Sequence, residues 1–309
     1  MSIIGECKSF LSANGIDNVK YYIRRPDGEI KAVVQVIHGM CDSFSKYEEL
    51  AEYLCSKGFA VIGHDQLGHG ATAAEEEDLG YFAPEHGWIY LVKDARTVTL
   101  KAYEEFENLP VFILGHSMGS LVARAYMSRW SCDIAGAILL GTVGRHTPAD
   151  AGIMLTDSVI AIHGDRYRSK KLCKLLLGLG SLKIADRKTE WDWLSTDESV
   201  VSAHTADKWS NFTFTASAFR DLFMLVSYNS SRKWYSKVRR NIPILLMGGS
   251  EDPVCSYGKA ITDIFNGLCR RGFTDVEAKI CSGCRHELIH EYNKEKTFDD
   301  IADWISKRI

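Results

Sequence analysis

The residues best suited to chemistry in this chain are a serine between two glycines and, far downstream, an aspartate and a histidine. Residues 115–119 read Gly-His-Ser-Met-Gly, so Ser117 is at the centre of a Gly-x-Ser-x-Gly motif. A serine hydroxyl at neutral pH is a poor nucleophile, and it needs a histidine base that is itself oriented by a carboxylate. Three such side chains together could carry out acyl transfer through a covalent intermediate.

The segments on either side of Ser117 predict a strand, a sharp turn and a helix. Residues 111–114 are all apolar, and residues 121–127 continue with apolar side chains at helical spacing. In this context the motif is typical of a nucleophile elbow, in which a strained serine is exposed at a strand end above a helix N-terminus. Glycines are needed beside it because larger side chains would meet the neighbouring strand and helix. The alternative is a serine that only caps the helix.

The acid and the base are expected in that order after the serine, each just beyond a strand. Residues 244–247 form an apolar run that is followed by Asp252, and the run 276–280 is followed by His286. We therefore predict that Asp252 and His286 complete a catalytic triad with Ser117. The neighbouring residues that could take the two roles instead are Glu251 and His290.

A tetrahedral intermediate also needs two backbone N–H donors directed at its oxyanion. One is predicted to be the amide of Met118, directly after the serine. The other is predicted at Met40, in the loop that follows the run 32–37 and His38, where Gly39 permits a tight turn. The ten histidines show no spacing typical of a metal site, so we predict neither a metal nor a cofactor.

The rest of the chain alternates strands and helices around these residues. A hairpin over 8–25 precedes apolar strand-like runs at 32–37, 59–62, 111–114, 134–140, 243–247 and 276–280, with helical periodicity between them. Continuous apolar strands joined by helices predict a mostly parallel, doubly wound α/β sheet covered on both faces. The alternation stops over 142–231, which we predict to be a helical cap inserted into a core formed by 1–141 and 232–309. An insertion at the carboxyl edge of the sheet should lie over Ser117.

Composition and charge exclude several classes of protein. A formal net charge of −3, without a basic run interleaved with aromatics, argues against nucleic acid as a partner. No window approaches the roughly twenty apolar residues of a membrane span, and the N-terminus has no signal-peptide pattern. Nine scattered cysteines are typical of reduced thiols, so we expect a cytoplasmic protein. Cys281 and Cys284 have the spacing of a redox or zinc pair, but an isolated pair is weak evidence.

Five motifs in the correct order resemble the α/β-hydrolases of the monoacylglycerol lipase and bacterial lysophospholipase type, the serine-aminopeptidase-like hydrolases. They lie at residues 38–40, 63–70, 115–119, 250–253 and 285–287. The resemblance spans essentially the whole chain and reaches the insertion at 191–197 and 219–223. It implies the α/β-hydrolase fold and a serine hydrolase that cleaves carboxylic esters of single-chain acyl lipids through an acyl-enzyme.

The chain departs from this family directly after the oxyanion loop. Monoacylglycerol lipases usually carry Gly-Glu-His there, with an arginine shortly after, whereas residues 41–43 read Cys-Asp-Ser and Lys46 follows. If the acid–base pair of the family recognises the glycerol end of the substrate, Asp42 and Lys46 could hold a polar head group here. The alternative is an ion pair at the surface.

The most apolar part of the insertion is residues 172–182. We expect Leu175 and Leu177 within it to line an acyl site above Ser117. Lys170 and Lys171 at its start would suit transient contact between the cap and an anionic membrane surface, with a helix buried against the core as the alternative.

Two other functions fit the same sequence. An aminopeptidase or a short-chain carboxylesterase could use the same triad, and an aminopeptidase would need acidic cap residues to hold a free amine. The acidic residues available in the cap are Glu190, Asp192, Asp197 and Glu198. A non-catalytic small-molecule receptor typically lacks a triad member, and here none is missing. In each case the predicted partner is a small molecule.

Overall fold

The computed structural model describes residues 4–107, 109–144, 148–174, 184 and 187–309. Its centre is one eight-stranded sheet with the order β1-β2-β4-β3-β5-β6-β7-β8. The strands are β1 Ile4–Leu11, β2 Asn18–Arg25, β3 Ala32–Ile37, β4 Phe59–His64, β5 Val111–His116, β6 Gly136–Leu140, β7 Ile244–Gly249 and β8 Val276–Cys281. The predicted hairpin is β1 and β2, which pair antiparallel, and β2 pairs antiparallel with β4. From β4 to β8 every neighbouring pair is parallel, which confirms the predicted mostly parallel sheet.

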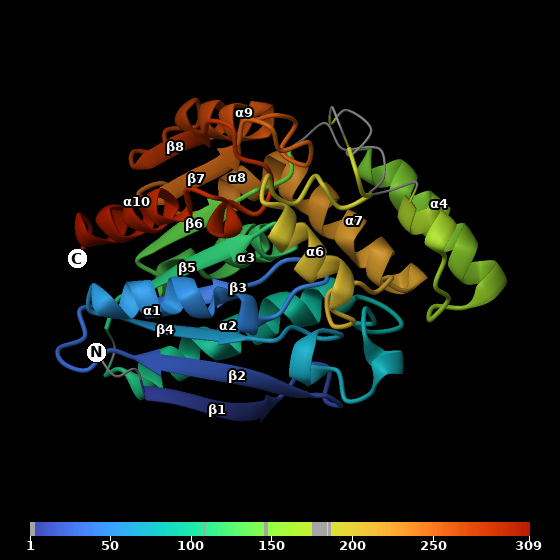
Figure 1. Cartoon of the computed structure of the whole chain (residues 1–309), viewed down its shortest axis with the longest axis horizontal. Helices are drawn as coiled ribbons and strands as arrows, with labels where there is room; N and C mark the ends of the chain where they lie inside the picture. The colour runs from blue at the N-terminus through green and yellow to red at the C-terminus, as the bar shows by residue number, and fades with distance from the viewer. Residues whose placement is uncertain (1–3, 108, 145–147, 175–183, 185–186) are drawn as a thin grey trace.

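Helices cover both faces of the sheet because the central strands are apolar on both sides. Ile113, Leu139 and Leu246 pack into one hydrophobic cluster, and the next residues along each strand, such as Leu114, point into the opposite one. The helices of the core are α1 Glu48–Ser56, α2 Gly87–Glu105, α3 Met118–Trp130, α8 Arg232–Lys237, α9 Lys259–Cys269 and α10 Lys294–Ser306. Helices α1 and α10 cover one face, and α2, α3, α8 and α9 cover the other (Figure 1).

The segment between β6 and β7 contributes no strand to the sheet among its described residues. It carries α4 Ala149–His163, α6 Glu198–Ala206 and α7 Ala216–Ser230. Helix α7 packs against α2 and α3 of the core on one side and against α4 on the other. Gly152 allows α4 to approach, because a Cβ atom there would lie 2.6 Å from the ring of Phe223. We call residues 142–231 the cap; the exact division between core and cap stays a prediction.

The parallel strands bring distant residues to one edge of the sheet. Strands β3, β5, β7 and β8 all end at this edge, and the loops that follow them carry the residues singled out from the sequence. Helix α7 of the cap is the outer neighbour of α3, and α4 is the outermost cap helix (Figure 1). All nine cysteines are free thiols. No helix in the described part of the chain is long and apolar enough to cross a bilayer.

Candidate active site

Ser117 lies in a strained turn between β5 and α3. Its backbone has φ 51° and ψ −119°, a conformation that is unfavourable for a residue with a side chain. Its amide donates to the carbonyl of Leu140 on the neighbouring strand at 2.9 Å. The flanking glycines allow the close approach, because a Cβ atom on Gly119 would lie 2.0 Å from the carbonyl oxygen of Ile37 and one on Gly115 would lie 2.5 Å from that of Gly119. The local geometry is that of a nucleophile elbow.

Asp252 and His286 are brought together from the loops after β7 and β8. The distance between Oδ2 of Asp252 and Nδ1 of His286 is 2.9 Å, and both side chains are buried. The other carboxylate oxygen accepts from the amide of Val254 at 2.8 Å, so the acid is fixed before it meets the ring. Nε2 of His286 has no hydrogen-bond partner among the described residues.

Burial and charge act in opposite directions on His286. Burial disfavours the charged ring, but the Asp252 carboxylate outweighs this effect and raises the pKa of His286 above its ordinary value. A positive charge that develops on this ring is therefore stabilised in place by the neighbouring acid.

Neither alternative residue takes part in the pair formed by Asp252 and His286. The side chain of Glu251 is exposed to solvent. His290 places Nδ1 3.0 Å from the carboxylate of Glu287 and Nε2 2.9 Å from the carbonyl of Lys46. Both of these partners are hydrogen-bond acceptors. Burial acts to lower the pKa of His290, but the Glu287 carboxylate outweighs burial and raises the pKa. Thus the structure pairs Asp252 with His286 rather than either alternative.

The loop after β3 is held by contacts to three of its peptide groups. Gly39 donates its N–H to Oδ2 of Asp42 at 3.2 Å, and its carbonyl lies 2.8 Å from Nδ1 of His38. The amide of Cys41 donates to Nε2 of His69 at 3.2 Å. The amide of Met40 lies between these contacts, in a residue that lines the same pocket as Ser117.

Met118, the other predicted oxyanion donor, is the first residue of α3. Its amide therefore has no helical carbonyl to bond. Gly39 brings the two loops together, because a Cβ atom there would lie 3.3 Å from Cβ of Ser117. The two amides are thus carried by adjacent loops, as an oxyanion hole requires.

Asp42 and Lys46 occupy different positions. Asp42 is buried, does not line the pocket, and uses its carboxylate to accept from Gly39, from the amide of Ser43 at 2.8 Å and from the hydroxyl of Tyr47 at 2.9 Å. These contacts place its carboxylate in the loop that carries Met40, and a role toward a head group stays a prediction. Lys46 does line the pocket, with Nζ 3.8 Å from Oδ1 of Asp42.

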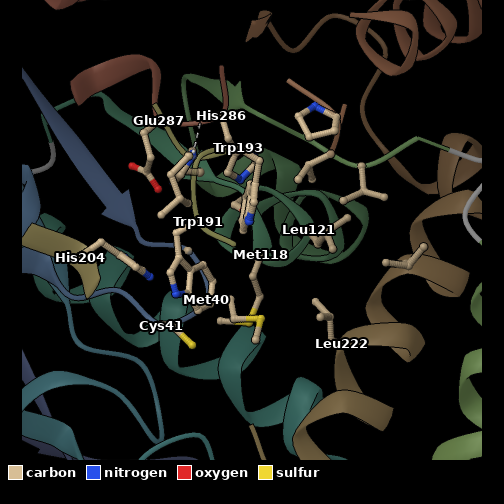
Figure 2. Close-up of a pocket in the computed structure, with 18 of the residues that line it drawn as sticks. Met40, Cys41, Met118, Leu121, Trp191, Trp193, His204, Leu222, His286 and Glu287 are labelled. Carbon is tan, nitrogen blue, oxygen red and sulfur yellow. Dashed lines mark hydrogen bonds between the residues drawn. The ribbon is translucent and has the colours of Figure 1, made fainter. Parts of the chain in front are cut away.

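Above Ser117 is a cavity of about 240 Å³ with a polar and an apolar end. Glu287 and His204 lie on one side and Leu222 on the other, with Met118 between them (Figure 2). Lys46 joins the polar end. The apolar end is lined by Leu121, Val143, Phe219, Leu222, Phe223 and Val226. Leu175 and Leu177, predicted to line the acyl site, lie outside the described residues.

The polar end combines three groups of different charge. His204 on α6 is mostly buried and its Nε2 has no partner among the described residues. Burial, and then the nearby Lys46, lower the pKa of His204 to about 4, so the ring is neutral. Burial opposes ionisation of Glu287, yet positive charge from His116, His290 and Lys46 holds the pKa of its carboxyl well below its usual range.

Two tryptophans of the cap complete the pocket, and reasoning from the sequence did not place them there. The ring of Trp193 is centred 5.2 Å from the ring of His286, and that of Trp191 is 4.8 Å from His204. The only signal available was the Trp-x-Trp spacing itself, which does not show what the rings contact.

A family model described as "Serine aminopeptidase, S33" matches residues 28–293 of the chain. The chain belongs to this family. Its curated relatives include the monoglyceride lipase of Homo sapiens, 27% identical over 92% of this chain and 85% of that protein. The monoacylglycerol lipase of Mycolicibacterium smegmatis is 26% identical, over 96% and 95% of the two chains. Both similarities extend over more than nine-tenths of this chain.

Solved structures of other proteins have the same fold as this chain. The carboxyl esterase of Bacillus coagulans in complex with glycerol superposes with a TM-score of 0.93 at 29% identity, covering 99% of both chains. The monoglyceride lipase of Saccharomyces cerevisiae, with a TM-score of 0.79 at 18% identity, shares the fold. The predicted α/β-hydrolase fold is confirmed.

Proposed function

We propose that this protein is a serine hydrolase that cleaves carboxylic esters of single-chain acyl lipids through an acyl-enzyme intermediate. The observation that carries the proposal is that His286, hydrogen-bonded to the buried Asp252, lines the same mainly apolar pocket as the strained Ser117. Hydrolysis of an ester requires a nucleophile, a base and a site for the acyl chain, and this pocket offers all three.

In the proposed reaction, Ser117 attacks the ester carbonyl while Nε2 of His286 takes the hydroxyl proton. Asp252 holds the ring through Nδ1 and stabilises the imidazolium that forms. The amides of Met40 and Met118 bind the oxyanion. His286 then gives its proton to the leaving alcohol, and the Ser117 ester remains. Water, deprotonated by His286 in turn, hydrolyses this ester and releases the fatty acid.

The two ends of the pocket support a substrate with one acyl chain and a neutral, hydroxyl-bearing head group. The carboxylate of Glu287 and the free Nε2 of His204 suit hydroxyl groups, and Lys46 can donate to a further oxygen. A phosphodiester head would face the negative charge of Glu287. Proteins named monoglyceride lipase among the relatives, and the esterase solved with glycerol, support the same substrate class.

The acidic cap residues do not support an aminopeptidase. None of the four lines the pocket. Asp192 accepts from the backbone amides of Lys188 and Thr189, and Asp197 accepts from that of Ser199 at the start of α6. Their carboxylates therefore have structural partners rather than a position for a free amine.

We also propose that the outer face of α4 contacts a lipid surface while substrate is taken up. Met154 and Ile162 are 72% and 75% exposed, and Leu155 lies beside them on the helix at 39%. Helix α4 packs on α7, which supplies the apolar end of the pocket, so this face is next to the route that an acyl chain would use. Lys170, also exposed, would suit anionic lipid.

A substrate profile tests the proposal. We expect 1-decanoylglycerol to be hydrolysed, with a kcat/KM well above that for 1-decanoyl-lysophosphatidylcholine and with no turnover of aminoacyl p-nitroanilides. Turnover of p-nitrophenyl acetate alone, without the longer esters, would leave a short-chain carboxylesterase. Turnover of the anilides would overturn the lipid assignment.

A further inference from the structure

A second buried carboxylate lies close to His286 but takes no part in the proposed triad. Glu291 is 2% exposed and accepts hydrogen bonds from the amide of Arg285 at 2.6 Å and from the amide of Thr196 at 3.1 Å. It also accepts from the hydroxyls of Thr196 and Ser195. No described residue forms an ion pair with it. A buried carboxylate that is satisfied only by neutral donors is sensitive to the loss of any one of them.

These hydrogen bonds connect the cap with the loop after β8. Ser195 and Thr196 belong to the cap, and Arg285 directly precedes His286. In the opposite direction, the guanidinium of Arg285 donates to the carbonyls of Asp192 at 2.6 Å and Ser195 at 3.0 Å. We call the five residues Asp192, Ser195, Thr196, Arg285 and Glu291 the clasp.

Backbone hydrogen bonds run alongside the clasp. Glu287 donates its amide to the carbonyl of Leu194 at 2.7 Å, and His286 donates to that of Trp193 at 3.4 Å. The cap segment therefore follows the histidine loop for several residues. This arrangement places the indole of Trp193 against the imidazole of His286, with 51° between the ring planes.

The outermost helix of the cap is attached differently. Asp150 and Asp157 of α4 contact Ser227 and Arg220, which belong to α7, another cap helix. The clasp joins the cap directly to the loop of the proposed base. Movement at the clasp would therefore displace the loop of His286, whereas these two contacts of α4 involve only another cap helix.

From these contacts we infer that Glu291 and Arg285 are positioning residues, which fasten cap residues 191–197 to loop 285–287 so that Trp193 holds the His286 ring against Asp252. This edge of the cap is a fixed wall of the site. The inference rests on the proposed role of His286 as the base.

The kinetic test uses Glu291→Gln, which replaces one acceptor oxygen by a donor that faces other donors. We expect kcat to fall at least about tenfold with a KM close to that of wild type, because the base is misplaced while the pocket keeps its lining. A ring held less closely to Asp252 loses part of the interaction that raises its pKa, so the acid limb of kcat/KM should move to lower pH. The matched control is Glu198→Gln, a cap glutamate with a side chain 74% exposed, which should behave as wild type.

The second arm needs no catalytic activity. Amide hydrogen exchange in residues 193–197 and 285–288 should be at least about tenfold faster in Glu291→Gln than in wild type, while exchange in α4 is unchanged. If Glu291→Gln does not fold, Thr196→Val removes one donor to the carboxylate and should show the same changes to a smaller extent, whereas Thr196→Ser keeps the hydroxyl and should retain the clasp. If both segments of Glu291→Gln exchanged at the wild-type rate and the acid limb did not move, the inference would be wrong. A wild type that hydrolyses no ester would contradict the proposed function, and the exchange arm would still decide whether the clasp exists.

Discussion

The floor of the pocket and its walls are built in different ways. The floor residues Ser117, Asp252 and His286 come from loops after three strands of one sheet, and hydrogen bonds fix their positions. The walls come largely from the cap, through α7 and residues 191–194, and are mostly apolar. Hydrogen-bonded geometry is specific to within fractions of an ångström, whereas apolar contact tolerates change. We therefore expect the floor to determine the rate for every substrate and the walls to determine which substrates are accepted.

The largest effect should come from the floor. Ser117→Ala should lower kcat/KM at least about a thousandfold for esters of every chain length, since the covalent route is lost and only binding and the oxyanion donors remain. Steady-state hydrolysis of p-nitrophenyl butyrate and decanoate measures this loss. Ser128→Ala, farther along the same helix, is the matched control. A loss confined to one chain length would place Ser117 among the wall residues.

A nearly equal effect is expected at the acid. Asp252→Asn should lower kcat roughly a thousandfold, because the imidazole loses its orienting carboxylate. In wild type, activity should fall as the pH drops through the raised pKa of His286, since the protonated ring cannot accept the serine proton. Without the carboxylate, burial alone acts on the ring, so the residual activity should have its acid limb at lower pH.

Glu251→Gln is the control for this experiment, since that side chain is exposed. Activity and pH profile should both remain as in wild type. Damage from Glu251→Gln with a nearly silent Asp252→Asn would mean that the acid has been assigned wrongly.

The apolar wall should have a smaller effect that depends on chain length. Each buried methylene contributes about 0.8 kcal/mol, so four more carbons should raise wild-type kcat/KM by up to about two-hundredfold. Leu222→Gln should remove much of this gain while acetyl ester turnover changes little. Met224→Gln, on the same helix but outside the pocket lining, should keep the gain. A flat wild-type profile from acetyl to decanoyl would mean that the apolar end does not bind the acyl chain.

The polar wall should discriminate among head groups. His204→Leu should raise KM for 1-decanoylglycerol by about tenfold, since a hydroxyl of the head group loses a partner in the buried site. The KM for p-nitrophenyl decanoate, which has no such hydroxyl, should change much less. Equal changes for both esters would indicate that His204 only shapes the pocket.

The smallest effect on catalysis is expected at the outer face of α4. Met154→Glu combined with Ile162→Glu should reduce co-sedimentation with vesicles of phosphatidylcholine and phosphatidylglycerol, while hydrolysis of a water-soluble ester is maintained. Ile16→Glu is the control, because Ile16 is 79% exposed and lies in the turn of the N-terminal hairpin. If the α4 variant sedimented with vesicles as the wild type does, the proposed membrane contact would be wrong.

The sequence allowed the floor to be predicted more fully than the walls. Each candidate of the floor directly follows an apolar run, and parallel strands must bring their carboxyl ends to one edge. The order of the motifs therefore narrowed the acid to Asp252 or Glu251 and the base to His286 or His290, and the structure pairs Asp252 with His286. Their chemical roles remain proposals that the variants above address.

The walls depend on contacts between distant parts of the chain. Trp193 reaches His286 because the clasp joins residues more than ninety positions apart, and no local pattern encodes that pairing. Asp42 was assigned to the substrate from its place in the sequence, yet its carboxylate turns inward to the loop that carries Met40. The apolar run at 172–182 is expected to line an acyl site, but its residues 175–182 lie outside the described residues. The apolar end of the pocket that the structure describes is lined mainly by α7.

The most direct test of the central claim is the site of covalent modification by a fluorophosphonate that carries a decyl chain. Intact-mass and peptide mass spectrometry should find one adduct per chain, on Ser117, formed more slowly when 1-decanoylglycerol is present. Absence of the adduct in wild type, or an adduct that persists in Ser117→Ala, would contradict the account.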